Sequence, residues 1–163
     1  MTKNLLDIAG IGQDRLHVAW VSSAEAQRFV EIATATVESV RKQGALDGEA
    51  FAMALEAVDM TVNSETIRWL VGKEVKITTK GDVYGRPCDV ESYEAVLHKE
   101  LEREYQTNLI MLSIKKGCTS VRDISAEIGV DLLRISYLLA DLEKTNKVEF
   151  TGMQDHKPVF AVL

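Results

Sequence analysis

The residues that could support metal binding or redox chemistry are few, and they lie far apart in the sequence. The two cysteines, Cys88 and Cys118, are widely separated and neither belongs to a CxxC pair, which favours reduced thiols over cluster ligands or a disulfide. The histidines His17, His98 and His156 show no HxH or HExxH spacing, so they do not form a recognisable metal motif. We therefore expect no metal and no cofactor.

Phosphate-binding and nucleophile motifs are also missing from the sequence. The GIG at residues 10–12 precedes the apolar run at residues 16–21, whereas a dinucleotide-binding glycine loop follows its strand. The chain contains no GxSxG sequence, the pattern that places a nucleophilic serine on a strand-to-helix turn. These observations predict that the protein is not an enzyme.

The composition is that of an ordinary globular protein. Of the 163 residues, 46% are hydrophobic and 27% are charged, and the net charge is -6. These values argue against disorder, and the acidic balance weakens the case for nucleic acid, whose affinity rests largely on Lys and Arg. No apolar run is long enough to span a bilayer, and the N-terminus has no signal-peptide core. We expect a cytoplasmic protein that does not bind membranes.

The chain is organised around an extended run followed by a helix, over residues 16–43. The run LHVAWV carries the β-branched and aromatic residues of a strand. Ser22 and Glu25 have the spacing of a capping box, and Arg41 opposes the helix dipole shortly before Gly44 ends the helix. The pattern predicts a strand–turn–helix unit, as in an α/β layer. The apolar residues at helical spacing are Phe29, Ile32, Ala33, Thr36, Val37 and Val40.

The run GIGQDRLHVAWVSSAEAQRFVEI resembles the C-terminal part of the delta (iron–sulfur) subunit of methyl-viologen-reducing hydrogenase. In that family RL, an apolar strand, Trp, an apolar residue and S-x-A/S-E precede a long helix. The resemblance includes NLLDIAGI and extends through IRWLVGKEVKITTKGDVYGRP, so that it covers residues 3–87. The family's cysteine-rich N-terminal portion, which holds the cluster, has no counterpart here. The resemblance therefore implies a scaffold that does not itself transfer electrons.

The remainder of this first part predicts a small helical layer and then a domain boundary. Helical patterns surround EVKITT at residues 74–79, which alternates with period two as a strand does. Residues 81–89 contain glycines and a proline that interrupt regular structure. We therefore predict a first domain at residues 1–88 and a second at residues 89–163.

The last part of the chain has the element order of a winged helix-turn-helix. A long helix is predicted over residues 91–116, a short helix begins after Ser120, and a third begins after Asp131. Two β-prone runs, KVEFT and PVFAVL, follow with a loop between them. The similarity to winged-helix domains covers residues 105–163. The predicted fold class is α+β and mostly helical, with an N-terminal strand–helix α/β fragment and a C-terminal winged helix-turn-helix.

The third helix of this domain is where we expect partner contacts. Its outward positions include Leu132, Arg134 and Tyr137; only Arg134 is cationic, and carboxylates flank it. The wing loop GMQDHK adds Lys157. Because DNA binding normally uses more Lys and Arg than this, we predict that these three helix residues bind protein. Trp20 is a further predicted partner-binding residue, since the family pattern also has an aromatic residue there.

Three functions are compatible with the sequence. The first, implied by the resemblance, is a non-catalytic accessory or assembly subunit of a heterodisulfide-reductase-like electron-transfer complex and, more narrowly, of one that serves sulfur oxidation. The second is a winged-helix DNA-binding transcription regulator. The third is a redox-regulated protein that uses Cys88 and Cys118. An unpaired strand edge at residues 16–21 also predicts a homodimer, unless residues 75–79 or a partner cover that edge.

Overall fold

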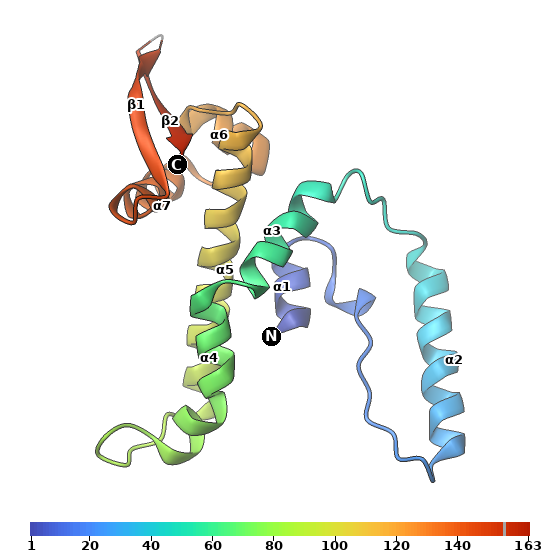
Figure 1. The fold of residues 1–163 in the computed structure, drawn as a ribbon. Helices are drawn as coiled ribbons and strands as arrows, with labels where there is room; N and C mark the ends of the chain where they lie inside the picture. The colour runs from blue at the N-terminus through green and yellow to red at the C-terminus, as the bar shows by residue number, and fades with distance from the viewer. Residues whose placement is uncertain (155) are drawn as a thin grey trace. The chain divides into compact units, whose positions relative to one another are not determined.

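Helices make up most of the chain, and the described part contains one two-stranded antiparallel sheet (Figure 1). The computed structural model describes residues 1–154 and 156–163; Asp155, predicted within the wing loop, lies outside the described residues. The chain divides into two compact units, residues 1–52 and 53–163. These features agree with a mostly helical α+β class. None of the helices in the described ranges is both long and apolar enough to cross a membrane.

The first unit contains α1 (Thr2–Ile8), the 3₁₀ helix η1 (Gln13–Arg15) and α2 (Ala26–Gln43). Hydrogen bonds join η1 to the end of α2. The Arg15 guanidinium donates to the carbonyl oxygens of Gly44 (3.2 Å) and Gln43 (3.4 Å). The Gln43 amide donates to the carbonyl oxygen of Asp14 (2.8 Å). The C-terminal end of α2 is therefore fixed to η1.

The strand predicted at residues 16–21 is wrong. This segment has no regular secondary structure, and no strand in the described part of the chain pairs with it. An extended run becomes a stable strand only when a neighbouring strand satisfies its backbone N–H and C=O groups. The predicted strand–helix α/β fragment is therefore absent, although the helix that follows is present as α2.

The strand predicted at residues 74–79 is also wrong, because this segment is helical. α4 (Glu65–Val75) continues directly into the π-helical turn η2 (Lys76–Lys80). The hydroxyls of Thr78 and Thr79 donate to carbonyl oxygens one turn earlier, on Glu74 and Val75. These side-chain bonds accommodate the β-branched threonines in a helix. Residues 74–79 consequently do not supply a strand that could cover residues 16–21.

In the second unit α5 (Val90–Lys115) is the longest helix, and α4 packs along it (Figure 1). The Tyr93 hydroxyl on α5 donates to the carbonyl oxygen of Leu70 on α4 (3.0 Å). The Asn108 amide on α5 donates to the hydroxyl of Thr61 (3.0 Å), which belongs to α3 (Ala52–Val62). The boundary predicted at residues 81–89 thus lies inside this unit. The division into a domain of residues 1–88 and a domain of residues 89–163 stays a prediction.

The C-terminal part of the second unit places two short helices and a hairpin around the end of α5. The elements are α6 (Val121–Ile128), α7 (Leu132–Lys144), β1 (Val148–Gln154) and β2 (Lys157–Val162). β1 and β2 pair antiparallel with an irregularity between Phe150 and Gly152. These elements follow the order that the sequence predicts. Their buried core comprises Ile110, Ile114, Ile124, Ile135, Leu138, Leu139, Leu142 and Val148.

Local side-chain caps fix where α6 and α7 begin. The Ser120 hydroxyl accepts a hydrogen bond from a first-turn N–H of α6, and the Asp131 carboxylate does the same for α7. Gly129 ends α6 in the left-handed region, with φ of 69°. The hairpin is attached to the loop before α6 because the Phe160 N–H donates to the carbonyl oxygen of Thr119 (3.0 Å). The hairpin therefore lies beside the start of α6.

Candidate functional site

The predicted partner-binding residues lie on two surfaces. Trp20 belongs to the first unit and is 89% exposed. Leu132, Arg134 and Tyr137 lie on α7 in the second unit. The two surfaces belong to different units and are described separately below as candidate docking surfaces.

The outer side of α7 is apolar near the start of the helix. The inward side is fully buried and belongs to the C-terminal core. On the outer side Leu133 is 63% exposed and Tyr137, one turn later, is 64% exposed, with Leu132 beside them. We call Leu132, Leu133 and Tyr137 the α7 surface. Sequence reasoning missed Leu133, although its spacing of four residues from Tyr137 places both on the same side of a helix.

Arg134 does not extend freely from α7. Its Nε donates to the side-chain oxygen of Gln106 on α5 (2.8 Å), and the residue is half-buried. Farther along the same helix, Asp141 accepts from Arg103 of α5 (3.1 Å). Both contacts join α7 to α5. Arg134 therefore joins α7 to α5 in the observed arrangement, and its role in partner binding stays a prediction.

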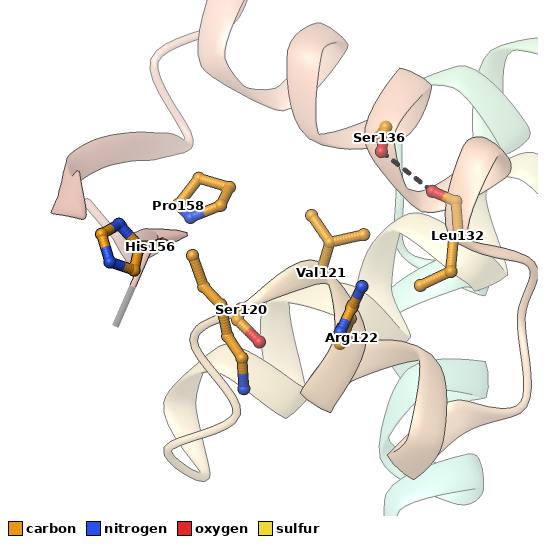
Figure 2. A pocket seen from close by; sticks show the side chains of 8 residues that line it. Ser120, Val121, Arg122, Leu132, Ser136, His156 and Pro158 are labelled. Atoms are coloured by element: carbon orange, nitrogen blue, oxygen red, sulfur yellow. Dashed lines mark hydrogen bonds between the residues drawn. The ribbon is translucent and has the colours of Figure 1, made fainter. Parts of the chain in front are cut away.

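A pocket of about 520 Å³ opens beside the α7 surface (Figure 2). Figure 2 shows His156 and Pro158 at one side of it and Leu132 and Ser136 at the other. The start of α6 lies between them. Three elements therefore contribute to one concave site. Among the described residues, the lining comprises Ser120, Val121, Arg122, Leu132, Ser136, His156, Lys157 and Pro158.

The pocket has a basic character. Arg122 enters from α6, and Lys157 with His156 comes from the hairpin. Among the described residues that line the pocket none is acidic, and within the described ranges neither Arg122 nor Lys157 forms an ion pair. We call this site the basic pocket. The sequence indicates Lys157 only as a cation of the wing loop, because the pocket that it shares with Arg122 depends on the tertiary fold.

The hydroxyl groups of the basic pocket are already engaged. The Ser120 hydroxyl donates to the Asp123 carboxylate (2.6 Å) and accepts from the Asp123 N–H (3.2 Å). The Ser136 hydroxyl donates to the carbonyl oxygen of Leu132 (2.9 Å), as Figure 2 shows. The donors that remain for a ligand are thus the cationic side chains. Such a donor set is suited to anions, above all to carboxylate and phosphate oxygens.

The surface of the first unit is a largely uncovered amphipathic helix. No residue of α2 is buried, and Phe29 is 61% exposed. Only part of the predicted capping box forms. The Glu25 carboxylate accepts from the Ser22 N–H (2.9 Å), whereas the Ser22 hydroxyl accepts from Ala24 and the helix begins at Ala26. We call the exposed apolar side chains of α2 the α2 surface: Phe29, Val30, Val37 and Val40.

The cysteines are held apart by the length of a helix. Cys88 lies just before α5 and Cys118 just after it, and both are half-buried free thiols. A helix of 26 residues separates its ends by about 39 Å at ~1.5 Å per residue. The two thiols therefore do not form a redox pair within one chain. Nor do three or more His, Cys, Asp or Glu side chains gather as metal ligands anywhere in the described residues.

Comparison with known protein families found a match for the N-terminal segment. Residues 1–44 match the sequence model of the methyl-viologen-reducing hydrogenase delta subunit. The match supports the N-terminal part of the resemblance found in the sequence, and it ends at the residue that terminates α2. Neither the curated proteins nor the solved structures gave a match. The segment that resembles this hydrogenase subunit is thus the one that carries Trp20 and the α2 surface.

Proposed function

We propose that this protein is a non-catalytic accessory or assembly subunit of a heterodisulfide-reductase-like electron-transfer complex. The observation that carries the proposal is the coincidence of the family match with an uncovered apolar surface. Residues 1–44 resemble a subunit of a hydrogenase, and α2 within them exposes Phe29 and its apolar neighbours. A helix with one apolar side normally buries that side, and contiguous exposed apolar residues mark interaction sites.

The non-catalytic role is proposed from the ligands that this chain offers. Iron–sulfur clusters are commonly held by four cysteine thiolates, whereas this chain carries two cysteines. Those two lie at opposite ends of α5. We infer that the electron carriers of the complex belong to its other subunits. Cytoplasmic location and a role in sulfur oxidation are narrower proposals, and the latter rests on the resemblance to the delta subunit alone.

We further propose that residues 105–163 form a winged helix-turn-helix that acts as a second docking surface. Support comes from the order α5, α6, α7, β1, β2 around one apolar core. The exposed positions of its third helix are apolar at Leu132, Leu133 and Tyr137. Of the two cations on that helix, Arg134 is engaged with Gln106 and Lys144 pairs with Asp141. A docking role for protein follows from this distribution of apolar and charged side chains.

Affinity purification from the native organism tests the subunit proposal. The tagged protein should retain polypeptides that contain flavin and iron–sulfur clusters. Replacing Phe29 and Val40 by Ser should abolish retention, because each large apolar side chain that is buried contributes about 1.5–3 kcal/mol, or roughly 10–150-fold in affinity. The matched control is Val83→Ser, since Val83 is 93% exposed in the loop before α5.

Two results would contradict the proposal. One is the recovery of no flavin- or cluster-containing polypeptide under conditions in which the protein is intact. The other is equal retention by the α2 variant and by the Val83→Ser control, because contact would then not involve the α2 surface. Circular dichroism of the α2 variant shows whether its helix content is unchanged.

A DNA-binding regulator is the second candidate, favoured by the convergence of Arg122, His156 and Lys157 beside α7. In that case Arg134→Ala should cost about 1–3 kcal/mol for a specific site, while Leu132→Ala should have little effect. For protein docking the order is reversed. Fluorescence anisotropy with duplex DNA, and retention of the partner complex, distinguish the two candidates.

Homodimerisation stays a prediction with a changed basis. It was predicted from a strand edge, and residues 16–21 are not a strand. A second copy could instead cover the α2 surface. Light scattering at micromolar concentration decides between a monomer and a dimer, and a stable monomer would leave the α2 surface available to a different protein.

A further inference from the structure

The basic pocket differs in charge from the protein as a whole. The chain has a net charge of -6, yet Arg122, His156 and Lys157 meet in one cavity of about 520 Å³. These side chains come from two elements that are far apart in sequence, α6 and the β-hairpin. Arg122 and Lys157 carry a positive charge at neutral pH, so each would attract an anion bound in the pocket that both line. The pocket is consequently a place where an anionic group would be stabilised.

The basic pocket is continuous with the α7 surface. Leu132 belongs to both, since it lines the pocket and lies beside the exposed Leu133 and Tyr137. A ligand that places a negative group near Arg122 and Lys157 would therefore meet apolar side chains along α7. This combination matches an acidic residue flanked by apolar residues on a polypeptide.

Nucleic acid fits this surface less well than a peptide does. Duplex binding uses many phosphate contacts by Lys and Arg, and the α7 surface offers Leu133 and Tyr137 where such contacts would be needed. Arg134 donates to Gln106 on α5.

We propose that the basic pocket binds the side-chain carboxylate of an Asp or Glu in a partner protein, whose neighbouring apolar residues lie on the α7 surface. This rests on the proposed docking role of α7 and adds the chemistry of the partner. Arg122 donates two parallel N–H groups to the carboxylate oxygens, the geometry that guanidinium favours. Lys157 adds a second positive charge. The serines contribute no donor, because their hydroxyls are bonded within the protein.

A random peptide library displayed on phage tests the proposal without a known partner. The full-length protein should enrich peptides in which Asp or Glu is flanked by apolar residues. Synthetic copies of these peptides should lose at least about tenfold in affinity when Asp or Glu is replaced by its amide, the effect expected when a charge-assisted hydrogen bond is lost. Arg122→Gln combined with Lys157→Gln should cause a similar loss for the original peptides.

The matched control is Lys42→Gln combined with Lys99→Gln. It changes the net charge by the same amount, and both lysines are exposed and lie outside the pocket lining. Binding by this control should equal that of the unmodified protein. If both double variants weaken binding equally, the effect comes from net charge and the proposal is overturned. Enrichment of peptides without acidic residues, or of none, also overturns it.

A further arm uses duplex DNA of random sequence. The proposal is overturned if the protein binds DNA more tightly than the selected peptides and if the double variant at Arg122 and Lys157 loses DNA binding while the control variant keeps it. The pocket would then be a phosphate site. Failure of the subunit proposal is a separate result. Acidic peptides that require the pocket would support this inference even where affinity purification recovers no flavin- or cluster-containing polypeptide.

Discussion

A buried hydrogen bond between α3 and α5 offers the sharpest test of how the second unit is held together. Thr61 is completely buried and Asn108 is nearly so. The Thr61 hydroxyl accepts from the Asn108 side-chain amide (3.0 Å) and donates to the carbonyl oxygen of Ala57 on its own helix (2.7 Å). One hydroxyl thus satisfies a donor on α5 and an acceptor on α3. Water is excluded from both groups, so neither has a ready substitute.

Thr61→Val removes this hydroxyl with little change of shape. The Asn108 amide then stays buried without its acceptor, which costs about 1–3 kcal/mol of unfolding free energy. Asn108→Leu should also lower the unfolding free energy, because the buried Thr61 hydroxyl then loses the donor from α5. The double variant should lose less unfolding free energy than the two single variants together, because it leaves no unpaired polar group. The difference, which is the coupling energy between the two residues, should be roughly 0.5–3 kcal/mol. Since domains are stable by about 5–15 kcal/mol, these changes are measurable.

Urea unfolding followed by circular dichroism supplies the free energies. Thr66→Val is the matched control, because Thr66 is exposed on α4 and surface substitutions usually stay within about 0.5 kcal/mol. A cost for Thr61→Val no larger than that of the control would refute the reasoning. Strict additivity of the two buried substitutions would likewise show that Thr61 and Asn108 do not act as a pair.

Two further predictions concern the loop before α5 and the start of that helix. Gly81→Ala should destabilise the loop, because the φ of Gly81 is +78° and a Cβ there would clash with the carbonyl group of Arg86. Hydrogen exchange of residues 82–88 should become faster. Asp89 caps α5, and the hydrogen bond from the Ser92 N–H lowers the pKa of its carboxyl below the ordinary 3.8. Its stabilising effect is therefore present above that value and is lost as the pH falls through the lowered pKa. Asp89→Asn should therefore lower the unfolding midpoint at neutral pH, and the difference from the unmodified protein should shrink as the pH falls below 3.8. A difference that stays constant with pH would contradict the assignment.

The helices could be predicted from sequence where their signals are local. Ser120 and Asp131 were expected at helix starts, and each accepts a hydrogen bond from a first-turn N–H group. The hairpin β1–β2 was predicted for a similar reason, since its two strands are adjacent in sequence and pair with each other. The extended runs at residues 16–21 and 74–79 failed because strand formation depends on a distant partner, which periodicity does not reveal.

The candidate site was predictable only in part. Leu132 and Tyr137 were expected on the outer side of the third helix, and the structure exposes both. The orientation of Arg134 was not predictable, because its partner Gln106 lies on another helix. The basic pocket depends on the packing of α6 against the hairpin, which brings Arg122 close to residues that are distant in sequence.

The two units differ in what stabilises their helices, and this difference predicts where a partner has its largest effect. α7 buries a continuous side against the C-terminal core, whereas no residue of α2 is buried and hydrogen bonds from η1 hold only its last turn. Most helical stability in proteins comes from packing of an apolar side, so an unpacked helix is marginal in water. In the free protein the amides of α2 should therefore exchange with solvent much faster than those of α7.

Complex formation should slow exchange along α2, and most of all near Phe29, which has the largest exposed side chain on that helix. Amides on the inner side of α7 should change little, because their protection already comes from the core. Hydrogen exchange of the free and complexed protein, read by mass spectrometry, provides the comparison. If the α2 amides in the free monomer were already as protected as those of α7, the helix would not need a partner, and the argument that links the matched segment to docking would fail.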